Sequence, residues 1–278
     1  MSDYKNTQLG KVTHYVDQYD PSLLDPISRS EARPDHYSSS NLPFLGVDLW
    51  TAYEFSWLNS DGLPQIAILE CYVPCDSDSI VESKSFKLYL NSYSQAQFIS
   101  HEEVTERLIK DLSHAVGASV EVTLYQVCEF NGFKPIAEPQ GICIDQKSVS
   151  IDCYQPNTEL LQLSSAEADE ITEETLYSHL LKSNCPVTNQ PDWASVYISY
   201  QGQKIDHAAL LKYIVSYRQH QDFHEQCVER IFTDIMACCV PQKLSVFACY
   251  MRRGGIDINP FRSTHAHRPA THFRQVRQ

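Results

Sequence analysis

The chain has 278 residues, of which 42% are hydrophobic and 21% are charged, an ordinary balance for one large globular domain or two smaller ones. Its net charge of −13 argues against direct binding to nucleic acid, which needs a basic face to meet phosphates. No apolar run approaches the roughly 20 residues that span a bilayer. The first residues are polar and lack the apolar segment of a secretory signal. We therefore expect a cytoplasmic protein that does not contact membranes.

The charge is distributed unevenly along the chain. Residues 251–278 contain six Arg and one Asp, with no Lys or Glu. Such a basic end on an acidic body indicates either a solvated tail or a site for a small anion such as a phosphorylated cofactor. For the last dozen residues we expect a solvated tail. The ten cysteines are expected to be reduced thiols, most of them buried as small apolar residues.

Residues 1–44 are rich in Asp, Ser, Pro and Tyr and show little periodicity, which predicts an irregular arm. Two similar series of elements follow, by the alternation of apolar residues and by turn signals. The first series comprises strands at 47–57 and 65–72 around a turn at 60–62, helices at about 82–94 and 101–115, and strands at 119–127 and 135–143 around Asn131-Gly132. The second comprises strands at 173–183 and 193–200, helices at about 206–218 and 223–238, and strands at 243–252 and 256–261 around Gly254-Gly255.

The two series share residues as well as element order. The segment that starts at His101 matches the segment that starts at His224 in five residues, all at a separation of 123. This pattern favours a duplicated domain, with one copy at 45–150 and the other at 151–278. The expected fold class is α+β, and each copy is expected to be an antiparallel four-stranded sheet with two helices on one face.

The segment from Cys185 to Asp192 is the first that indicates chemistry. Two prolines and an Asn-Gln pair predict a loop between two strands, with Cys185 ending one strand and Asp192 beginning the next. A hairpin brings its ends together, so a thiol nucleophile and a carboxylate proton carrier are expected at one rim of the sheet. The alternative is a buried cysteine beside a capping aspartate.

The second segment is Phe223-His224-Glu225, at the predicted start of a helix. There the His and Glu side chains point toward whatever lies beyond the helix end. An acidic residue at this position is also favoured by the helix dipole alone. His101-Glu102 fits that alternative equally well, so the repeat by itself assigns no chemistry.

Basic residues form the third pattern. Lys84 and Lys87 in Glu82-Ser-Lys-Ser-Phe-Lys-Leu-Tyr89 share a helical face, where helix N–H groups also attract anions. Arg252-Arg253-Gly254-Gly255 is a basic turn. Both suit a phosphate, and both are also typical of solvated surface. The chain lacks G-x-G-x-x-G, G-x-x-x-x-G-K-[ST] and H-E-x-x-H, and its cysteines form no convincing zinc set.

The segments described above resemble the sequences of the QueF family of NADPH-dependent 7-cyano-7-deazaguanine reductases. Glu82 to Tyr89 is similar to that family's signature motif, and Cys185-Pro-Val-Thr-Asn-Gln-Pro-Asp192 is similar to its nucleophile and acid segment. The resemblance runs from about residue 10 to the end and is closest to the long form with two modules. It implies tandem tunnelling-fold modules related to GTP cyclohydrolase I, a homodimer, and a role in queuosine modification of tRNA.

The resemblance also implies the activity and the residues that carry it. A small deazapurine nitrile is reduced to the primary amine with two NADPH and no metal, through a thioimide on the nucleophile. The catalytic residues implied are Cys185 as nucleophile, Asp192 as acid and His224 in proton transfer. The substrate-binding residues implied are Glu82, Ser83, Phe223, His224 and Glu225. The residues implied for NADPH are Ser83, Lys84, Lys87, Arg252, Arg253 and Gly254.

The lysine motif lies in the first copy and the Cys185 loop in the second, so we expect one working site to need both. Two alternatives stay open. One is a zinc-dependent enzyme similar to GTP cyclohydrolase with Cys185 as a ligand. The other is a purine- or pterin-binding module without catalysis.

Overall fold

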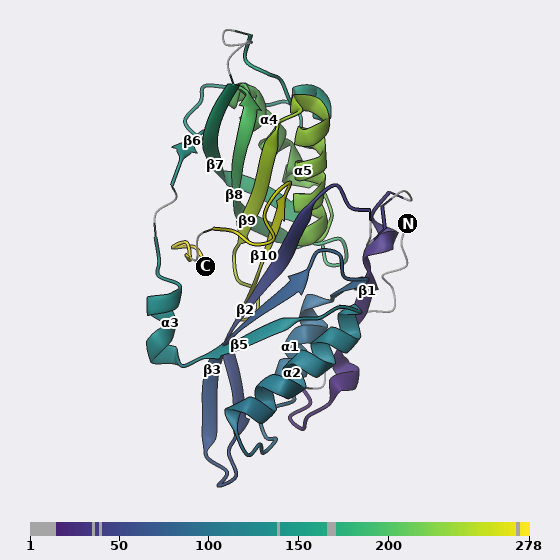
Figure 1. The fold of residues 1–278 in the computed structure, drawn as a ribbon, viewed down its shortest axis with the longest axis vertical. Helices are drawn as coiled ribbons and strands as arrows, with labels where there is room; N and C mark the ends of the chain where they lie inside the picture. Colours follow the sequence, from purple (N-terminus) through teal and green to yellow (C-terminus); the bar gives the residue numbers. More distant parts are fainter. Residues whose placement is uncertain (1–14, 35–36, 39–40, 138–139, 166–170, 271–272) are drawn as a thin grey trace. The chain divides into compact units, whose positions relative to one another are not determined.

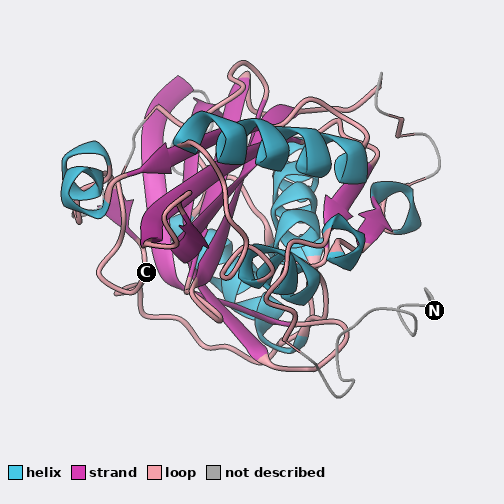
Figure 2. Cartoon of the chain, turned by 90° about the horizontal axis from the view of Figure 1, so that it is seen from below, coloured by secondary structure: helices cyan, strands magenta, loops and turns pink. Residues whose placement is uncertain are grey.

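The computed structural model describes residues 15–34, 37–38, 41–137, 140–165, 171–270 and 273–278. The structure is mixed α+β, as predicted (Figures 1 and 2). Its helices are α1 (Ser83–Asn91), α2 (His101–Val116), α3 (Val127–Phe133), α4 (His207–Ser216) and α5 (His224–Cys239). Its strands are β1 (Pro26–Ser28), β2 (Leu45–Leu58), β3 (Pro64–Pro74), β4 (Ser79–Val81), β5 (Glu121–Tyr125), β6 (Ile142–Cys143), β7 (Ile171–Asn184), β8 (Pro191–Gln203), β9 (Lys243–Tyr250) and β10 (Ile256–Ser263).

The chain divides into two compact units. Unit 1 holds the described residues of Met1–Leu42 together with Asp48–Pro135 and Arg252–Ile258. Unit 2 holds Pro43–Val47, the described residues of Ile136–Met251, and those of Asn259–Gln278. Among the residues described, no helix is long and apolar enough to cross a membrane.

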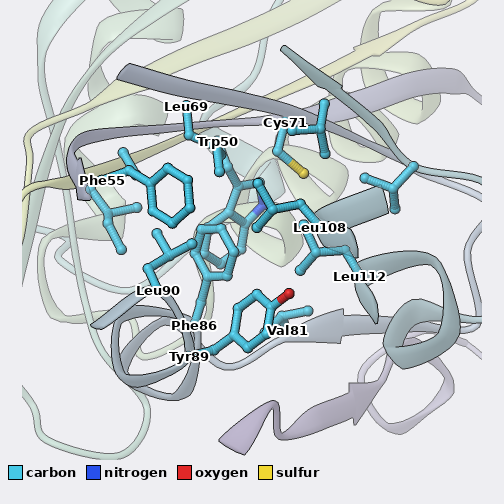
Figure 3. Close-up of a cluster of buried hydrophobic side chains, with 14 of the residues drawn as sticks. Trp50, Phe55, Leu69, Cys71, Val81, Phe86, Tyr89, Leu90, Leu108 and Leu112 are labelled. Atoms are coloured by element: carbon cyan, nitrogen blue, oxygen red, sulfur yellow. The ribbon is translucent and has the colours of Figure 1, made fainter. Parts of the chain in front are cut away.

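In unit 1 the strands lie in the order β5-β3-β2, followed by the first residues of β10. One face of this sheet packs against α1 and α2. On α2 the buried residues Val104, Leu108, Leu112 and Val116 recur every fourth position and form an apolar stripe. Trp50 on β2 meets Phe86 on α1 edge-to-face at 5.2 Å between ring centroids (Figure 3). Burial of these large side chains fixes the two helices on the sheet.

The strand predicted at 135–143 in the first copy is wrong. The turn predicted at Asn131-Gly132 before it is also wrong, because both residues lie within helix α3. Phe130 of α3 packs edge-on against Tyr53 and Tyr125, at 5.9 and 5.6 Å between centroids. Lys134 follows and is buried, with its ammonium 2.8 Å from Glu70 Oε1. These tertiary contacts outweigh the local turn preference of Asn-Gly. Of the described residues in 135–143, Ile142–Cys143 form a strand, which pairs in parallel with β7; residues 138–139 lie outside the described residues.

In unit 2 the order is β10-β9-β8-β7-β6, antiparallel except for β6. Helices α4 and α5 lie on the same side of β7–β9 (Figure 1). The end of the chain is not a solvated tail, contrary to expectation. Phe273 packs against Tyr197 of β8 at 5.6 Å, and Arg277 donates to Ser195 Oγ at 2.7 Å. Gln275 and Gln278 are buried.

Both units contain the same buried tyrosine–aspartate network. In unit 1, Tyr89 Oη lies 2.7 Å from Tyr93 Oη and donates to Asp111 at 2.8 Å. In unit 2, Tyr213 Oη lies 2.8 Å from Tyr217 Oη and donates to Asp234 at 2.6 Å. The recurrence of one three-residue network supports the duplicated-domain interpretation. The tandem tunnelling fold itself stays a prediction.

We predict that Tyr213→Phe lowers the free energy of unfolding by about 1–3 kcal/mol, because the half-buried Asp234 carboxylate loses its 2.6 Å donor and keeps only Arg230 Nε at 3.7 Å. Tyr89→Phe should cost less, since Asp111 keeps a second donor, the Tyr19 hydroxyl at 2.6 Å. Urea denaturation compares both variants with Tyr15→Phe, a control at a side chain that is 65% exposed. Equal, negligible losses in the two buried variants would show that the network contributes no stability.

Candidate active site

The hairpin between β7 and β8 sets the position of Cys185. Ser183 pairs with Asp192 and Asn184 pairs with Pro191. Because side chains alternate along a strand and paired residues share a face, Ser183 and Asp192 lie on one face, and Cys185 is expected there two residues on. The Cys185 N–H donates to Gln190 O at 2.9 Å, which closes the loop. The Cys185 side chain remains half-buried.

Asp192 contacts His224, the first residue of α5. Its Oδ1 lies 3.1 Å from His224 Nε2, and Asp192 is only 3% exposed. Nδ1 of His224 has no hydrogen-bond partner among the described residues. The imidazole therefore contacts a buried carboxylate through one nitrogen, and its second nitrogen is a buried polar atom that no described residue satisfies.

Asn184 joins the nucleophile loop to this helix. Its N–H donates to His220 O at 2.8 Å, and its carbonyl accepts from Asp222 N–H at 3.1 Å. Its side-chain amide donates to His220 O at 3.2 Å. Lys182 Nζ donates to Asn184 Oδ1 at 2.5 Å. The residue before Cys185 is thereby fixed to the segment that leads into His224.

Burial distinguishes the two copies of the His-Glu pair, which the sequence does not. Glu225 is 2% exposed, whereas Glu102 in the first copy is exposed to solvent. Phe223 is half-buried, and the Gln226 side chain accepts from its N–H at 3.3 Å. Glu225 is thus a buried carboxylate, and Glu102 is a solvated residue at a helix start.

In unit 1, Glu82 is the N-cap of α1. Its carboxylate accepts from Lys84 N–H at 2.8 Å and from Ser85 N–H at 2.7 Å. Burial raises the pKa of Glu82 above its ordinary value, and the two backbone N–H groups oppose that rise. Ser83 beside it is exposed and Lys84 is half-buried.

The structure brings Lys87 to the basic turn. Gly254 has a φ of +59°, a left-handed conformation that favours glycine, and the Lys87 ammonium lies 2.7 Å from where its Cβ would be. The Arg252 guanidinium lies over the Tyr53 ring, 4.2 Å from its centroid. Arg253 N–H donates to Ile256 O at 2.8 Å and closes the turn.

Sequence reasoning missed Asn184, Tyr53 and Tyr250. The ring of Tyr250 lies parallel to that of His224, with centroids 3.7 Å apart and an interplanar angle of 3°. No local pattern marks these residues, although Asn184 immediately precedes Cys185. Within the ranges that the structure describes, no group of three or more His, Cys, Asp or Glu side chains is arranged to hold a metal ion.

Comparison with known proteins places this chain in a family. Residues 15–124 match the family described as nitrile reductase, 7-cyano-7-deazaguanine-reductase N-term, and residues 191–269 match the QueF-like protein family. An NADPH-dependent 7-cyano-7-deazaguanine reductase of Paraburkholderia phymatum is 53% identical over 93% of both chains. One of the same description from Burkholderia orbicola is 52% identical over 99% of both. The chain belongs to the QueF family.

The QueF matches include most of the site residues. Glu82 to Lys87 lie in the first matched segment, and Asp192, the 223–225 segment and the Arg252-Gly254 turn lie in the second. Cys185 lies between the two. The crystal structure of the archaeosine synthase QueF-Like in its apo form matches 34% of this chain at 16% identity, with a TM-score of 0.31, too low to support an argument about fold.

We predict that Glu82→Gln removes a pH-dependent loss of stability. Because the pKa of folded Glu82 is raised above its ordinary 4.5, the unfolded chain ionises first as pH rises. Below that value both states are protonated and stability is unaffected. The free energy of unfolding of the native protein should therefore fall relative to the variant from about pH 4.5 up to the folded pKa.

Urea unfolding across this window measures the difference between the two proteins. Glu102→Gln is the matched control: hydrogen bonds lower the pKa of exposed Glu102, so its contribution to stability changes below pH 4.5 and should stay nearly constant across this window. A difference between native protein and Glu82→Gln that stays constant with pH would contradict the prediction.

Proposed function

We propose that this chain reduces the nitrile of 7-cyano-7-deazaguanine to the primary amine with NADPH, as part of queuosine modification of tRNA. The observation that carries the proposal is the contact of Asp192 with His224 beside the hairpin that holds Cys185. The activity named for two relatives more than 50% identical supports the same reaction.

The chemistry needs a nucleophile and a proton carrier together. The Cys185 thiolate adds to the nitrile carbon while nitrogen takes a proton, which gives a thioimide. A hydride delivered to that carbon and loss of the thiolate leave an imine, and a second hydride with a second proton gives the amine. One nitrile thus consumes two NADPH and two protons. Because water hydrolyses an imine, the site must exclude it between the two reductions.

We assign each of the chain's residues a role in this reaction. Asp192 delivers protons at the nitrile nitrogen, and His224 exchanges protons through its contact with Asp192 Oδ1. Glu225 and Glu82 bind the donor groups of the deazapurine, and Phe223 and Ser83 contact its ring or edge. The buried state of both glutamates supports binding by hydrogen bonds in a site with little water.

NADPH supplies the hydrides when bound. The residues present fit its phosphates: Lys87 lies against the Gly254 turn, and Arg252 lies on Tyr53 beside Arg253. Cationic side chains and a glycine turn that brings backbone N–H groups close are the usual phosphate partners. Ser83 and Lys84, at the N-terminus of α1, complete the proposed set. The homodimer, the tandem tunnelling fold and the cytoplasmic location belong to the same proposal.

We predict that the protein mixed with the nitrile, without NADPH, gains the whole mass of the nitrile on Cys185. Peptide mass spectrometry locates the adduct, and Cys185→Ala should abolish both adduct and turnover. Cys227→Ala should keep the adduct, because Cys227 is fully buried and burial raises the pKa of its thiol far above the ordinary value. An adduct that persists in Cys185→Ala would assign the nucleophile elsewhere.

Asp192→Asn should keep substrate binding and lose about a hundredfold to ten-thousandfold of turnover, the usual contribution of an acid–base group. The amide retains a hydrogen bond to His224 but transfers no proton. Steady-state rates and nitrile binding are compared with Asp222→Asn, a carboxylate on the segment before α5 that should be tolerated. Normal rates in Asp192→Asn would show that another group is the acid.

The basic residues should give a strong preference for NADPH over NADH, since the 2′-phosphate is the charge that distinguishes the two. Replacing both lysines of α1, or both arginines of the turn, with Ala should raise the KM for NADPH and leave the Cys185 adduct intact. Lys110→Ala, at an exposed position of α2, is the control. Unchanged KM in both double variants would place the cofactor elsewhere.

A further inference from the structure

Tyr250 on β9 lies directly beneath the imidazole of His224. The rings are 3.7 Å apart between centroids and tilted by only 3°. Tyr250 is fully buried. The corresponding histidine of the first copy, His101, meets Trp57 edge-on at 85° instead. The parallel contact thus belongs to the copy that carries Cys185 and Asp192.

A parallel contact restricts the imidazole in a way that its hydrogen bond does not. The contact to Asp192 Oδ1 fixes one nitrogen of His224 and leaves the ring free to rotate about that direction. Stacking on the flat Tyr250 ring keeps the plane of the His224 imidazole parallel to that ring. Stacking and the Asp192 contact together determine where Nδ1, which lacks a hydrogen bond in the described chain, points.

The backbone of Tyr250 is itself held firmly. It pairs with Ala194, two residues after Asp192, across β8 and β9. Its N–H donates to Asn259 Oδ1 at 2.9 Å, and its carbonyl accepts from Gln278 Nε2 at 3.1 Å. Gln278 also donates to Asn259 Oδ1 at 2.8 Å. Asn259 and Gln278 are 1% and 5% exposed. They therefore fix the position of β9, the strand that carries Tyr250.

The Tyr250 hydroxyl takes no part in the ring contact with His224 itself. It is buried near Ser183 and Cys227, without a hydrogen bond of ordinary geometry in the described residues. The ring alone accounts for the contact with His224. Phenylalanine at this position keeps the ring, and leucine keeps an apolar side chain without an aromatic face.

We propose that Tyr250 is a positioning residue for proton transfer, which sets the ring plane of His224 so that the imidazole serves Asp192 and the substrate nitrogen. The inference rests on the proposed nitrile reduction. It predicts that the aromatic face matters at this position and that the hydroxyl does not. It also predicts that Tyr250 acts only through His224.

The first test is the NMR spectrum of the full-length protein labelled in histidine, with the His224 signals identified by their loss in His224→Ala. An imidazole stacked on a ring has its carbon-bound protons shifted upfield by the ring current. We expect this shift in the native protein and in Tyr250→Phe, and its loss in Tyr250→Leu. Unshifted His224 signals in the native protein would overturn the proposal without any Tyr250 variant.

The second test is a double-mutant cycle on turnover of the nitrile with NADPH. Tyr250→Phe should stay within about twofold of the native kcat, and Tyr250→Leu should lose about 10- to 100-fold, as displaced catalytic groups do. In a His224→Ala background, Tyr250→Leu should cause no further loss, whereas a merely structural role gives the same loss in both backgrounds.

The outcomes separate this inference from the function on which it rests. If the native protein does not turn over the nitrile, the proposed function is wrong, whatever the NMR spectrum shows. Suppose the native protein turns over the nitrile. Full activity in Tyr250→Leu, or an equal loss from Tyr250→Leu in the native and His224→Ala backgrounds, then overturns the role of Tyr250 and leaves the proposed function unaffected. If Tyr250→Leu does not fold, Gln278→Ala replaces it, and an unchanged His224 spectrum and kcat there would contradict the role given to the held backbone.

Discussion

The rest of the site depends on the junction where the end of β7 hydrogen-bonds to the segment before α5. Asn184 makes backbone hydrogen bonds to His220 and Asp222 at 2.8 and 3.1 Å, and its side chain repeats the link to His220. Cys185 is the residue after Asn184, and α5 begins at His224, two residues after Asp222. A strand end and a helix start, distant in sequence, are thereby held at fixed separation. Pairing of Ser183 with Asp192 then brings the carboxylate to the same place.

The two units share one buried framework and differ at the start of one helix. Both units keep the buried network of two tyrosines and an aspartate, which fixes the first helix of each pair on the second. The two copies differ at the helix start that follows. His224 lies on a carboxylate and flat on Tyr250, and Glu225 is buried; His101 meets a tryptophan edge and Glu102 is exposed. Two helix starts that both begin with His-Glu thus differ in their contacts and in their burial.

Most elements were predictable because their patterns are strong. The alternation in β2 and β8 and the apolar spacing of α2 and α5 placed those elements within a few residues of their observed ends. The hairpin around Cys185 and Asp192 was also predictable, since prolines and Asn-Gln mark a loop and a hairpin brings its ends together. These are local signals that need no knowledge of the tertiary fold.

The errors and omissions concern long-range contacts. Asn131-Gly132 signals a turn, but Phe130 packs between two tyrosines and Lys134 pairs with Glu70, and α3 forms. Tyr250 stacks on His224, and Asn184 hydrogen-bonds to residues 220–222. Both contacts join segments that are separated along the chain and share no sequence pattern. The burial that distinguishes Glu225 from Glu102 follows from packing, which two segments that both begin with His-Glu do not reveal.

The measurement that tests the central claim most directly is the stoichiometry of the reaction. Purified full-length protein is incubated with a known amount of 7-cyano-7-deazaguanine and excess NADPH, and products and NADPH consumption are quantified together. Reduction of a nitrile through a protected imine predicts two NADPH oxidised for each nitrile consumed, with the primary amine as the product. One NADPH per nitrile with release of an aldehyde, or loss of nitrile without NADPH oxidation, would contradict the account.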